Sequence, residues 1–252
     1  MQRYFIELSY DGTAYHGWQT QPNAITVQEC VDRALSVFFR QPIATVGCGR
    51  TDTGVHATQF FAHFDMDTDK PGPFIEITGV NSLLPYDIAV KRIFQVASDA
   101  HARFNASSRT YHYQIHFYKD PFKNNRSWFY KGQLDVERMN EAASVLLEYS
   151  DFSCFSKSNT QTFTNNCQLT EAAFIRLADG LRFTIRADRF LRNMVRAVVG
   201  TLIRVGKSEI GPDELHKIIE SKDRSAAGQS VPACGLYLVD IQYPYLDKMN
   251  NV

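Results

Sequence analysis

The order of the predicted strands and helices limits the possible folds of this chain more than any other feature. In its first hundred residues the sequence predicts a strand, a helix, two strands, a helix and a strand. A capping box at Thr26 and Glu29, followed by apolar residues at helical spacing, marks the first helix. This order is that of a split βαβ, ferredoxin-like domain. The elements cover residues 3–10, 26–40, 43–48 and 58–64, a stretch ending at residue 84, and residues 88–94.

The second half repeats this order, with a hairpin about Asp179-Gly180 and an extra short helix before the last strand. We therefore predict an α+β protein of two ferredoxin-like halves, residues 1–103 and 104–252. Their sheets are expected to join into one mixed, mostly antiparallel sheet, with a site in the cleft between the halves. The second-half elements cover residues 109–118, 135–147, 172–178, 181–187, 190–204, 212–220 and 235–243.

Composition and charge distribution narrow the function classes. The 252 residues, 44% of them hydrophobic, are enough to bury a large core. No apolar run could span a bilayer and residues 1–10 lack a signal-peptide pattern, so we expect a cytoplasmic protein with no membrane partner. The net charge is zero, yet residues 182–207 hold seven basic residues against one acid, Asp188. That distribution predicts a locally positive face, as a nucleic-acid partner would require.

The cysteines and histidines give no metal-binding pattern. The five cysteines are an odd number, widely scattered and without a Cys-x-x-Cys pair, which argues against a zinc site and a disulfide framework. We expect buried free thiols. His112 and His116 lie on a predicted strand, where four residues separate two Cα atoms by roughly 13 Å, too far for one metal ion. The sequence predicts no metal site.

Residues 49–57, Gly-Arg-Thr-Asp-Thr-Gly-Val-His-Ala, form the segment richest in chemistry. Two glycines bracket Asp52, and glycine permits positive φ and close backbone approach, so a tight loop that presents a carboxylate is expected. Arg50 could hold a phosphate or the acid itself. The simpler interpretation is a turn between the two flanking strands.

This run of nine residues resembles the signature of the TruA-type tRNA pseudouridine synthases. The resemblance implies that Asp52 is the catalytic nucleophile of a uridine isomerisation. The reaction breaks the glycosidic bond, turns the uracil, rejoins it through C5 and removes the C5 proton. It needs neither a metal nor another cofactor, and a carboxylate can serve it by attack or by stabilising charge at C1′.

Two further motifs and one strand position are similar to the family. Tyr111, in residues 109–113, is implied to stack on the target base near the C5 deprotonation; the alternative is a core tyrosine on a strand. Arg196, in residues 190–196, is implied to pair with the catalytic aspartate and keep it ionised, the alternative being a solvated basic helix face. Leu236 is implied to support the flipped base, although by sequence alone it is strand core.

The remaining candidate residues are assigned to substrate binding. Thr51 and His56 match the signature, and His56 could equally satisfy the backbone of the loop. The segment 10–21 is also similar to the family, either as an RNA contact or as a packed support for the site. Phosphate contacts are expected from basic residues, namely Arg103, Arg109, Lys119, Lys123, Arg189, Arg192 and the rest of the 182–207 segment.

The resemblance also implies a partner and an assembly. It implies tRNA as substrate, with the modified uridines at positions 38, 39 and 40 of the anticodon stem-loop, and a homodimer. Two other classes stay open on the residues alone. A non-catalytic RNA-binding protein would use the same aromatics and arginines without needing Asp52. A nucleoside hydrolase or glycosylase would use one carboxylate at C1′ but release free uracil.

Overall fold

A computed structural model describes residues 1–67, 74–156 and 163–246 of the chain. The chain divides into two compact units, Met1–Ser107 with Leu238–Val252, and Ser108–Tyr237. The elements of the first unit are β1 (Gln2–Tyr10), the 3-10 turn η1 (Gly12–Ala14), α1 (Val27–Phe39), β2 (Val46–Gly47), β3 (His56–Met66), β4 (Phe74–Ile75), α2 (Thr78–Leu83) and β5 (Ile88–Gln95).

In its described residues, the second unit has a hairpin, β8–β9, and the α-helices α3, α4 and α5. Its elements are β6 (Ser108–His116), η2 (Pro121–Lys123), β7 (Trp128–Phe129), α3 (Val136–Val145), η3 (Leu146–Glu148), η4 (Ser153–Phe155), β8 (Leu169–Leu177), β9 (Gly180–Ala187), α4 (Met194–Gly206), α5 (Glu214–Ser221) and η5 (Ala233–Gly235). The last strand, β10 (Leu236–Gln242), begins where the second unit ends.

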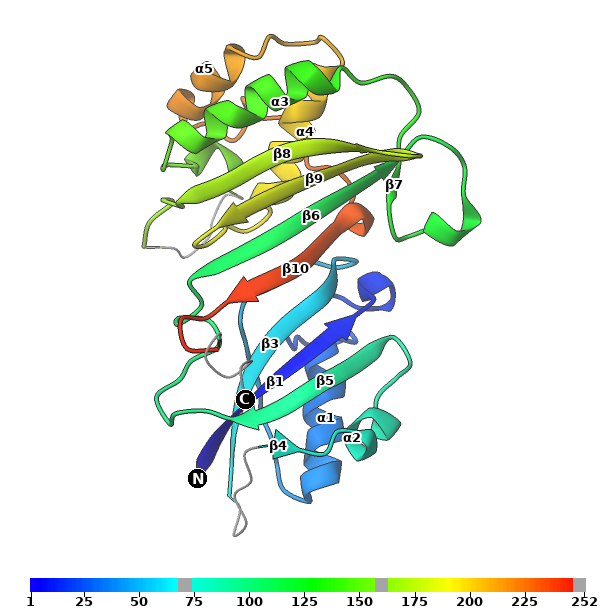
Figure 1. Cartoon of the computed structure of the whole chain (residues 1–252), viewed down its shortest axis with the longest axis vertical. Helices are drawn as coiled ribbons and strands as arrows, with labels where there is room; N and C mark the ends of the chain where they lie inside the picture. The colour runs from blue at the N-terminus through cyan, green and yellow to red at the C-terminus, as the bar shows by residue number, and fades with distance from the viewer. Residues whose placement is uncertain (68–73, 157–162, 247–252) are drawn as a thin grey trace. The chain divides into compact units, whose positions relative to one another are not determined.

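The hydrogen-bonded strand order confirms the predicted fold class. The strands follow the order β4-β5-β1-β3-β10-β6-β9-β8, with β2 beside β3 and β7 beside β6, in a mixed and mostly antiparallel sheet (Figure 1). The short strands β4 and β7 aside, each half of the chain has four strands in its described residues. Their order in the sheet is β5-β1-β3-β2 in the first half and β10-β6-β9-β8 in the second. In both halves the fourth strand along the chain lies beside the first, followed by the third and the second. That is the arrangement of a split βαβ domain, and it occurs once in each half of the chain.

Strand β1 organises the first unit because both of its neighbours pair with it. Phe5 lies opposite Phe94 on β5 and His63 on β3. Its fully buried ring also meets Tyr243 edge to face, with the ring centroids 5.3 Å apart, and the Tyr243 hydroxyl donates to the Ala102 carbonyl at 2.5 Å. These contacts explain why the last residues of the chain belong to the first unit.

The predicted capping box starts α1 as expected. Thr26 is the N-cap, and its hydroxyl accepts a hydrogen bond from the Glu29 N–H at 3.3 Å. The buried side chains of α1 recur at helical spacing and include Val27, Val31 and Leu35. In Figure 1 this helix lies along one side of the β1, β3 and β5 strands.

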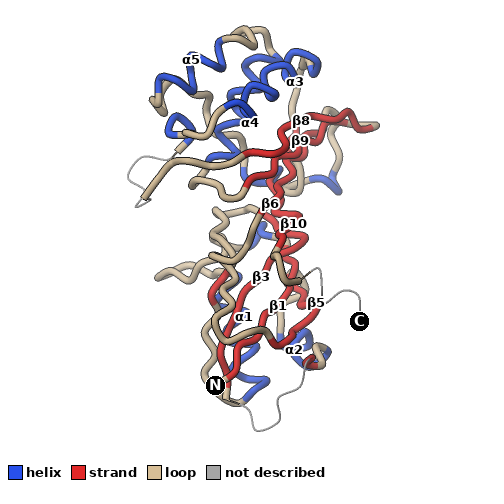
Figure 2. Tube along the Cα trace, turned by 60° about the vertical axis from the view of Figure 1, so that its left-hand side comes forward, coloured by secondary structure: helices blue, strands red, loops and turns tan. Residues whose placement is uncertain are grey.

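The helix α4 forms the centre of the second unit, and it begins later than predicted. The apolar pattern predicts a helix over residues 190–204, whereas α4 covers Met194–Gly206. Asn193 has a φ of 66°, a left-handed conformation that cannot belong to a right-handed helix, so the helix starts after it. Figure 2 shows α3, α4 and α5 gathered to one side of β8 and β9.

Other element boundaries differ by smaller amounts. The strand predicted over residues 43–48 is only the pair Val46–Gly47, and the helix predicted over residues 135–147 ends in the 3-10 turn Leu146–Glu148. The hairpin is found where predicted, with β9 starting at Gly180. Within the described residues, no helix is long and apolar enough to cross a membrane.

Buried His63 gives the first unit a pH-dependent stability. Its Nδ1 accepts a hydrogen bond from the Ala102 N–H at 3.1 Å, and burial, reinforced by His101 and Arg3, lowers its pKa to about 4. An unfolded histidine has a pKa of about 6.5. Folding therefore favours neutral His63, a stabilisation present above pH 6.5 and lost as the pH falls toward 4.

We expect the free energy of unfolding of wild type to fall more between pH 7 and pH 4 than that of His63→Gln. The excess fall should reach at most about 3 kcal/mol, at about 1.4 kcal/mol per pKa unit. Urea unfolding at each pH measures it, with His16→Gln at an exposed histidine as the control. Parallel pH curves for wild type and His63→Gln would contradict the assignment.

Candidate active site

The loop that carries Asp52 joins β2 to β3, as predicted. Gly54 has a φ of 76°, and the Val55 N–H donates to the Asp52 carbonyl at 3.1 Å, which closes a tight turn around the acid. Val55 is buried beneath this turn, whereas Asp52 is half-buried and the side chain of Thr53 is exposed. The loop therefore presents the carboxylate from a turn whose base is packed into the first unit.

Residues 10–18 hold this loop through hydrogen bonds to its backbone and to one side chain. The Trp18 N–H donates to the Thr51 carbonyl at 3.4 Å, and the Gly54 N–H donates to the Tyr15 carbonyl at 3.3 Å. The hydroxyls of Tyr10 and Thr51 lie 2.9 Å apart. Asp52 is thus flanked on both sides by residues that segment 10–18 holds.

Two glycines allow the segment and the loop to approach this closely. A Cβ atom added to Gly12 would lie 2.0 Å from the Val55 carbonyl oxygen, and one added to Gly17 would lie 2.2 Å from that of Thr51. Gly17 also has a φ of 84°, which other residues rarely adopt. Of the two interpretations left open for residues 10–21, these contacts give the segment a supporting role beneath the loop.

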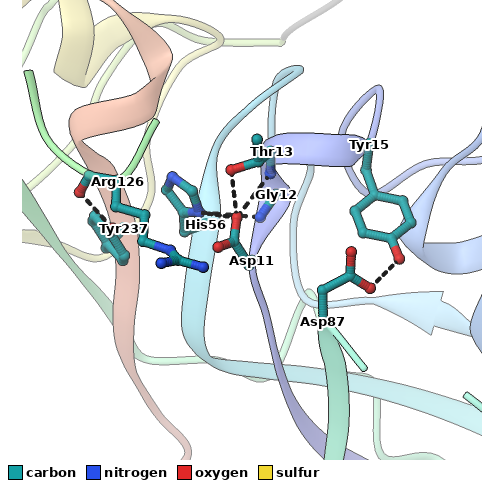
Figure 3. Close-up of polar contacts among 8 residues, drawn as sticks. All are labelled: Asp11, Gly12, Thr13, Tyr15, His56, Asp87, Arg126 and Tyr237. Atoms are coloured by element: carbon teal, nitrogen blue, oxygen red, sulfur yellow. Dashed lines mark hydrogen bonds and ion pairs between the residues drawn. The ribbon is translucent and has the colours of Figure 1, made fainter. Parts of the chain in front are cut away.

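His56, predicted to bind substrate, lies at the start of β3 and is 2% exposed. Its Nδ1 accepts a hydrogen bond from the Gly12 N–H at 3.0 Å, and the same atom lies 3.1 Å from an Asp11 carboxylate oxygen (Figure 3). Asp11 in turn accepts from the Thr13 N–H at 3.0 Å. The imidazole therefore contacts the segment that supports the Asp52 loop.

Asp87, an aspartate that sequence reasoning did not identify, completes this support by contacting Tyr15 of the 10–21 segment. The hydroxyl of buried Tyr15 donates to the carboxylate of Asp87, just before β5 (Figure 3). The Asp87 carbonyl accepts from the Asp11 N–H at 2.9 Å. Burial, together with the Asp87 carboxylate, raises the pKa of the Tyr15 phenol. No local pattern marks Asp87, because its partners lie more than seventy residues earlier in the chain.

Tyr111 lies on β6 in the second unit. It pairs across the strands with Ile185, is half-buried, and meets the Phe190 ring edge to face at a centroid distance of 5.1 Å. Tyr113, two residues along the same face, is fully buried, and its hydroxyl donates to the Pro232 carbonyl at 2.7 Å. Tyr113 is thus the core tyrosine of this strand, whereas Tyr111 is only half-buried.

Arg196 lies in the first turn of α4 and is half-buried. Its Nε donates to the Val231 carbonyl at 2.7 Å, and its own carbonyl accepts from the Val231 N–H at 3.2 Å. Leu236, the first residue of β10, is 7% exposed. The preceding Gly235 packs so tightly that an added Cβ would lie 2.7 Å from both the Gln114 carbonyl and the Tyr113 ring.

The basic residues predicted to bind phosphate fall into two groups. Arg109 donates to the Asp188 carbonyl at 2.6 Å, Arg186 to the Thr110 hydroxyl at 2.9 Å and Arg204 to the Ala226 carbonyl at 3.3 Å. Lys123 is paired with Asp179, and Arg189 is half-buried. The exposed group consists of Arg50, Arg103, Lys119, Arg192 and Lys207.

Burial keeps four of the five thiols in their protonated form. Burial raises the pKa of Cys154 and Cys167 to about 12, and it also raises the pKa of Cys30 and Cys234. These four groups stay protonated at neutral pH. In the described parts of the chain, no three His, Cys, Asp or Glu side chains gather as metal ligands would.

The predicted residues therefore fall into two sets, one in each unit. The first unit brings Thr51, Asp52 and His56 together on one loop and its support. In the second unit, Arg196 and the strand of Tyr111 are both tied to the stretch just before Leu236. Sequence reasoning identified the members of each set and gave support of the site as one of two interpretations of residues 10–21, but it did not identify Asp87 or Val231 as supporting residues.

The chain is similar to known proteins over nearly its whole length. A family model described as tRNA pseudouridine synthase matches residues 142–244. The chain is 52% identical to tRNA pseudouridine synthase A of Porphyromonas gingivalis over 247 residues, which cover 97% of this chain and 98% of that protein. The protein of the same name from Parabacteroides distasonis is 50% identical over 97% of both chains. That from Acetivibrio thermocellus is 39% identical over 96% of this chain and all of its own length.

The contact between Gly17 and the loop predicts the effect of a single methyl group. We expect Gly17→Ala to lower the free energy of unfolding by about 1–3 kcal/mol, because alanine must adopt a left-handed φ and push against the Thr51 carbonyl. Gly211→Ala, where an added Cβ meets nothing within 4 Å, is the matched control. Equal urea midpoints for the two variants would contradict this prediction, because they would show that the loop shifts to accommodate the added methyl group without a loss of stability.

Proposed function

This chain belongs to the tRNA pseudouridine synthase A family, from which we infer that it is an isomerase that converts uridine in tRNA to pseudouridine. We propose that Asp52 is its nucleophile. The hydrogen bonds that hold the loop are the observation that supports this role. Segment 10–18 fixes the residues on both sides of Asp52, while the carboxylate itself lies at a half-buried position on the turn.

A fixed carboxylate suits the reaction because the attacked atom must be approached from a defined direction. Asp52 forms a bond to the target nucleotide, at C1′ or at C6, and the N1–C1′ bond breaks. The uracil then turns, and C5 bonds to C1′. The bond to Asp52 breaks and regenerates the carboxylate, while the C5 proton leaves to solvent and N1 takes up a proton. A nucleophile that folding already holds in its reactive geometry need not be ordered in the transition state, and this lowers the activation barrier.

The second unit supplies the other proposed roles. The half-buried ring of Tyr111 stacks on the extruded base and lies near C5 during the proton removal. The guanidinium of Arg196 pairs with Asp52 and favours its ionised form. Leu236 supports the base with an apolar side chain. His56 and Thr51 act mainly through the loop, since both contact its supporting segment.

We also propose which uridines are modified and how the enzyme assembles. We propose that the substrate uridines are those at positions 38, 39 and 40 of the anticodon stem-loop, and that the enzyme works in the cytoplasm as a homodimer. Phosphate contacts come first from the exposed basic side chains, among them Arg50, Arg103 and Arg192. Binding to tRNA should weaken steeply as salt is added.

The role of Asp52 can be tested by tritium release from a tRNA transcript labelled at uridine C5. Pseudouridine formation must expel that atom, so wild type releases tritium, and Asp52→Asn should release none while it still binds tRNA. Activity at the wild-type rate in Asp52→Asn would remove the aspartate from the mechanism. Free uracil among the products would indicate a glycosylase, and binding without release by wild type would indicate an RNA-binding protein.

The substrate positions can be tested with transcripts that keep a uridine at only one of positions 38, 39 and 40. We expect tritium release from each of the three and none from a transcript in which all three are replaced. The replaced transcript should still bind, because phosphate contacts do not depend on the base at these positions. Release from it at the original rate would place the modified uridine elsewhere in the tRNA.

A further inference from the structure

Residues 224–231, called the strap here, lie along the first two turns of α4 in the second unit. Two glycines bring the strap and the helix into backbone contact, since a Cβ added to Gly200 would lie 1.8 Å from the Gln229 carbonyl oxygen. The buried N–H of Gly228 donates to the Thr201 hydroxyl at 2.8 Å. At its end, Val231 exchanges hydrogen bonds with Arg196, as described above.

Arg224 holds the strap in its bent path. Its Nη1 donates to the Gly228 carbonyl and its Nη2 to the Ser230 hydroxyl, both at 3.1 Å. The two bonds reach four and six residues along the chain from a single planar group. Because the guanidinium fixes both distances at once, residues 228–230 cannot move independently of Arg224.

The same hydroxyl connects Arg224 to the start of α4. Ser230 also accepts a hydrogen bond from the side-chain amide of Asn193 at 2.5 Å. Asn193 is the residue with left-handed φ that begins α4, and its amide makes no capping bond to the helix. The conformation that starts the helix three residues before Arg196 is therefore tied to the strap through Ser230.

We propose that Arg224 is a positioning residue for Arg196. Through Ser230 it fixes the turn from which Arg196 projects, and through the strap it places the Val231 carbonyl that holds the Arg196 Nε. This inference rests on the proposed function, in which Arg196 pairs with the nucleophile. Arg224 itself touches neither substrate nor the reacting atoms.

The test measures rate and affinity separately in the full-length enzyme. We expect Arg224→Ala to lower the single-turnover rate of tritium release by between about tenfold and a hundredfold, as a misplaced catalytic group does, with the Kd for tRNA unchanged. Arg224→Lys should lose nearly as much, because an ammonium cannot donate to Gly228 and Ser230 in the same fork geometry. Ser230→Ala should reduce the rate in the same direction.

Two neighbours provide matched controls. Lys222→Ala removes a positive charge two residues away, at an exposed side chain paired with Asp151. Ser225→Ala removes a hydrogen bond to Asp223 without touching the strap contacts. Both should keep the wild-type rate, and thermal melting checks that every variant is folded.

The outcomes separate this proposal from the proposed function. No release by wild type would overturn both. A slow Arg196→Ala beside a fast Arg224→Ala would overturn the positioning role and leave the function standing. A raised Kd with an unchanged rate for Arg224→Ala would make Arg224 a phosphate contact instead. In the Arg196→Ala background, Arg224→Ala should cause no further fall, and a full additional fall would mean that Arg224 acts independently of Arg196.

Discussion

The close approach of Gly12 and Gly17 to the carbonyls of the Asp52 loop is the contact on which the first unit's site depends. The sheet register explains why the contact occurs there. Tyr10, the last residue of β1, pairs with Ala57 near the start of β3 and with Ile88 at the start of β5. One end of the sheet thus gathers the segment after β1, the Asp52 loop before β3 and Asp87 before β5. Any side chain at either glycine would separate the layers that this register brings together.

The second unit also holds irregular backbone in place around its site residues, and there arginine side chains make many of the contacts. Both units have the split βαβ strand order, and both bring a loop close through glycines, Gly12 and Gly17 in the first and Gly200 and Gly228 in the second. The second unit adds a further kind of contact. Its arginine side chains donate to main-chain carbonyls, Arg196 to Val231, Arg204 to Ala226 and Arg224 to Gly228. A guanidinium offers five donors and remains charged, so it can hold irregular backbone that no sheet or helix satisfies.

The fold and the Asp52 loop could be predicted from the sequence because both depend on residues that are close together in the chain. Alternation, helical spacing and the Thr26 capping box gave the elements, and the bracketing glycines gave the turn. For the support of the site, the sequence offered residues 10–21 as one of two interpretations, but the other supporting residues could not be predicted in this way. Asp87 and Ser230 are single polar residues whose partners are distant in sequence, and the late start of α4 depends on the left-handed Asn193. Charge counting also placed Arg186 and Arg204 among the residues of a positive, phosphate-contacting face, although both donate to groups within the protein.

Pro232 gives the second unit a property that its hydrogen bonds alone would not provide. The carbonyls of Val231 and Pro232 are consecutive, and they accept from Arg196 and Tyr113 respectively. The only soft torsions between these carbonyls belong to Pro232, whose ring fixes φ, here at −52°, and whose presence also confines Val231 to extended conformations. The spacing between Arg196 and Tyr113 is therefore nearly fixed in the folded chain. Little conformational entropy remains at this place to be lost on binding. The ordering of this part of the site is completed when the chain folds, and a bound nucleotide need not contribute to it.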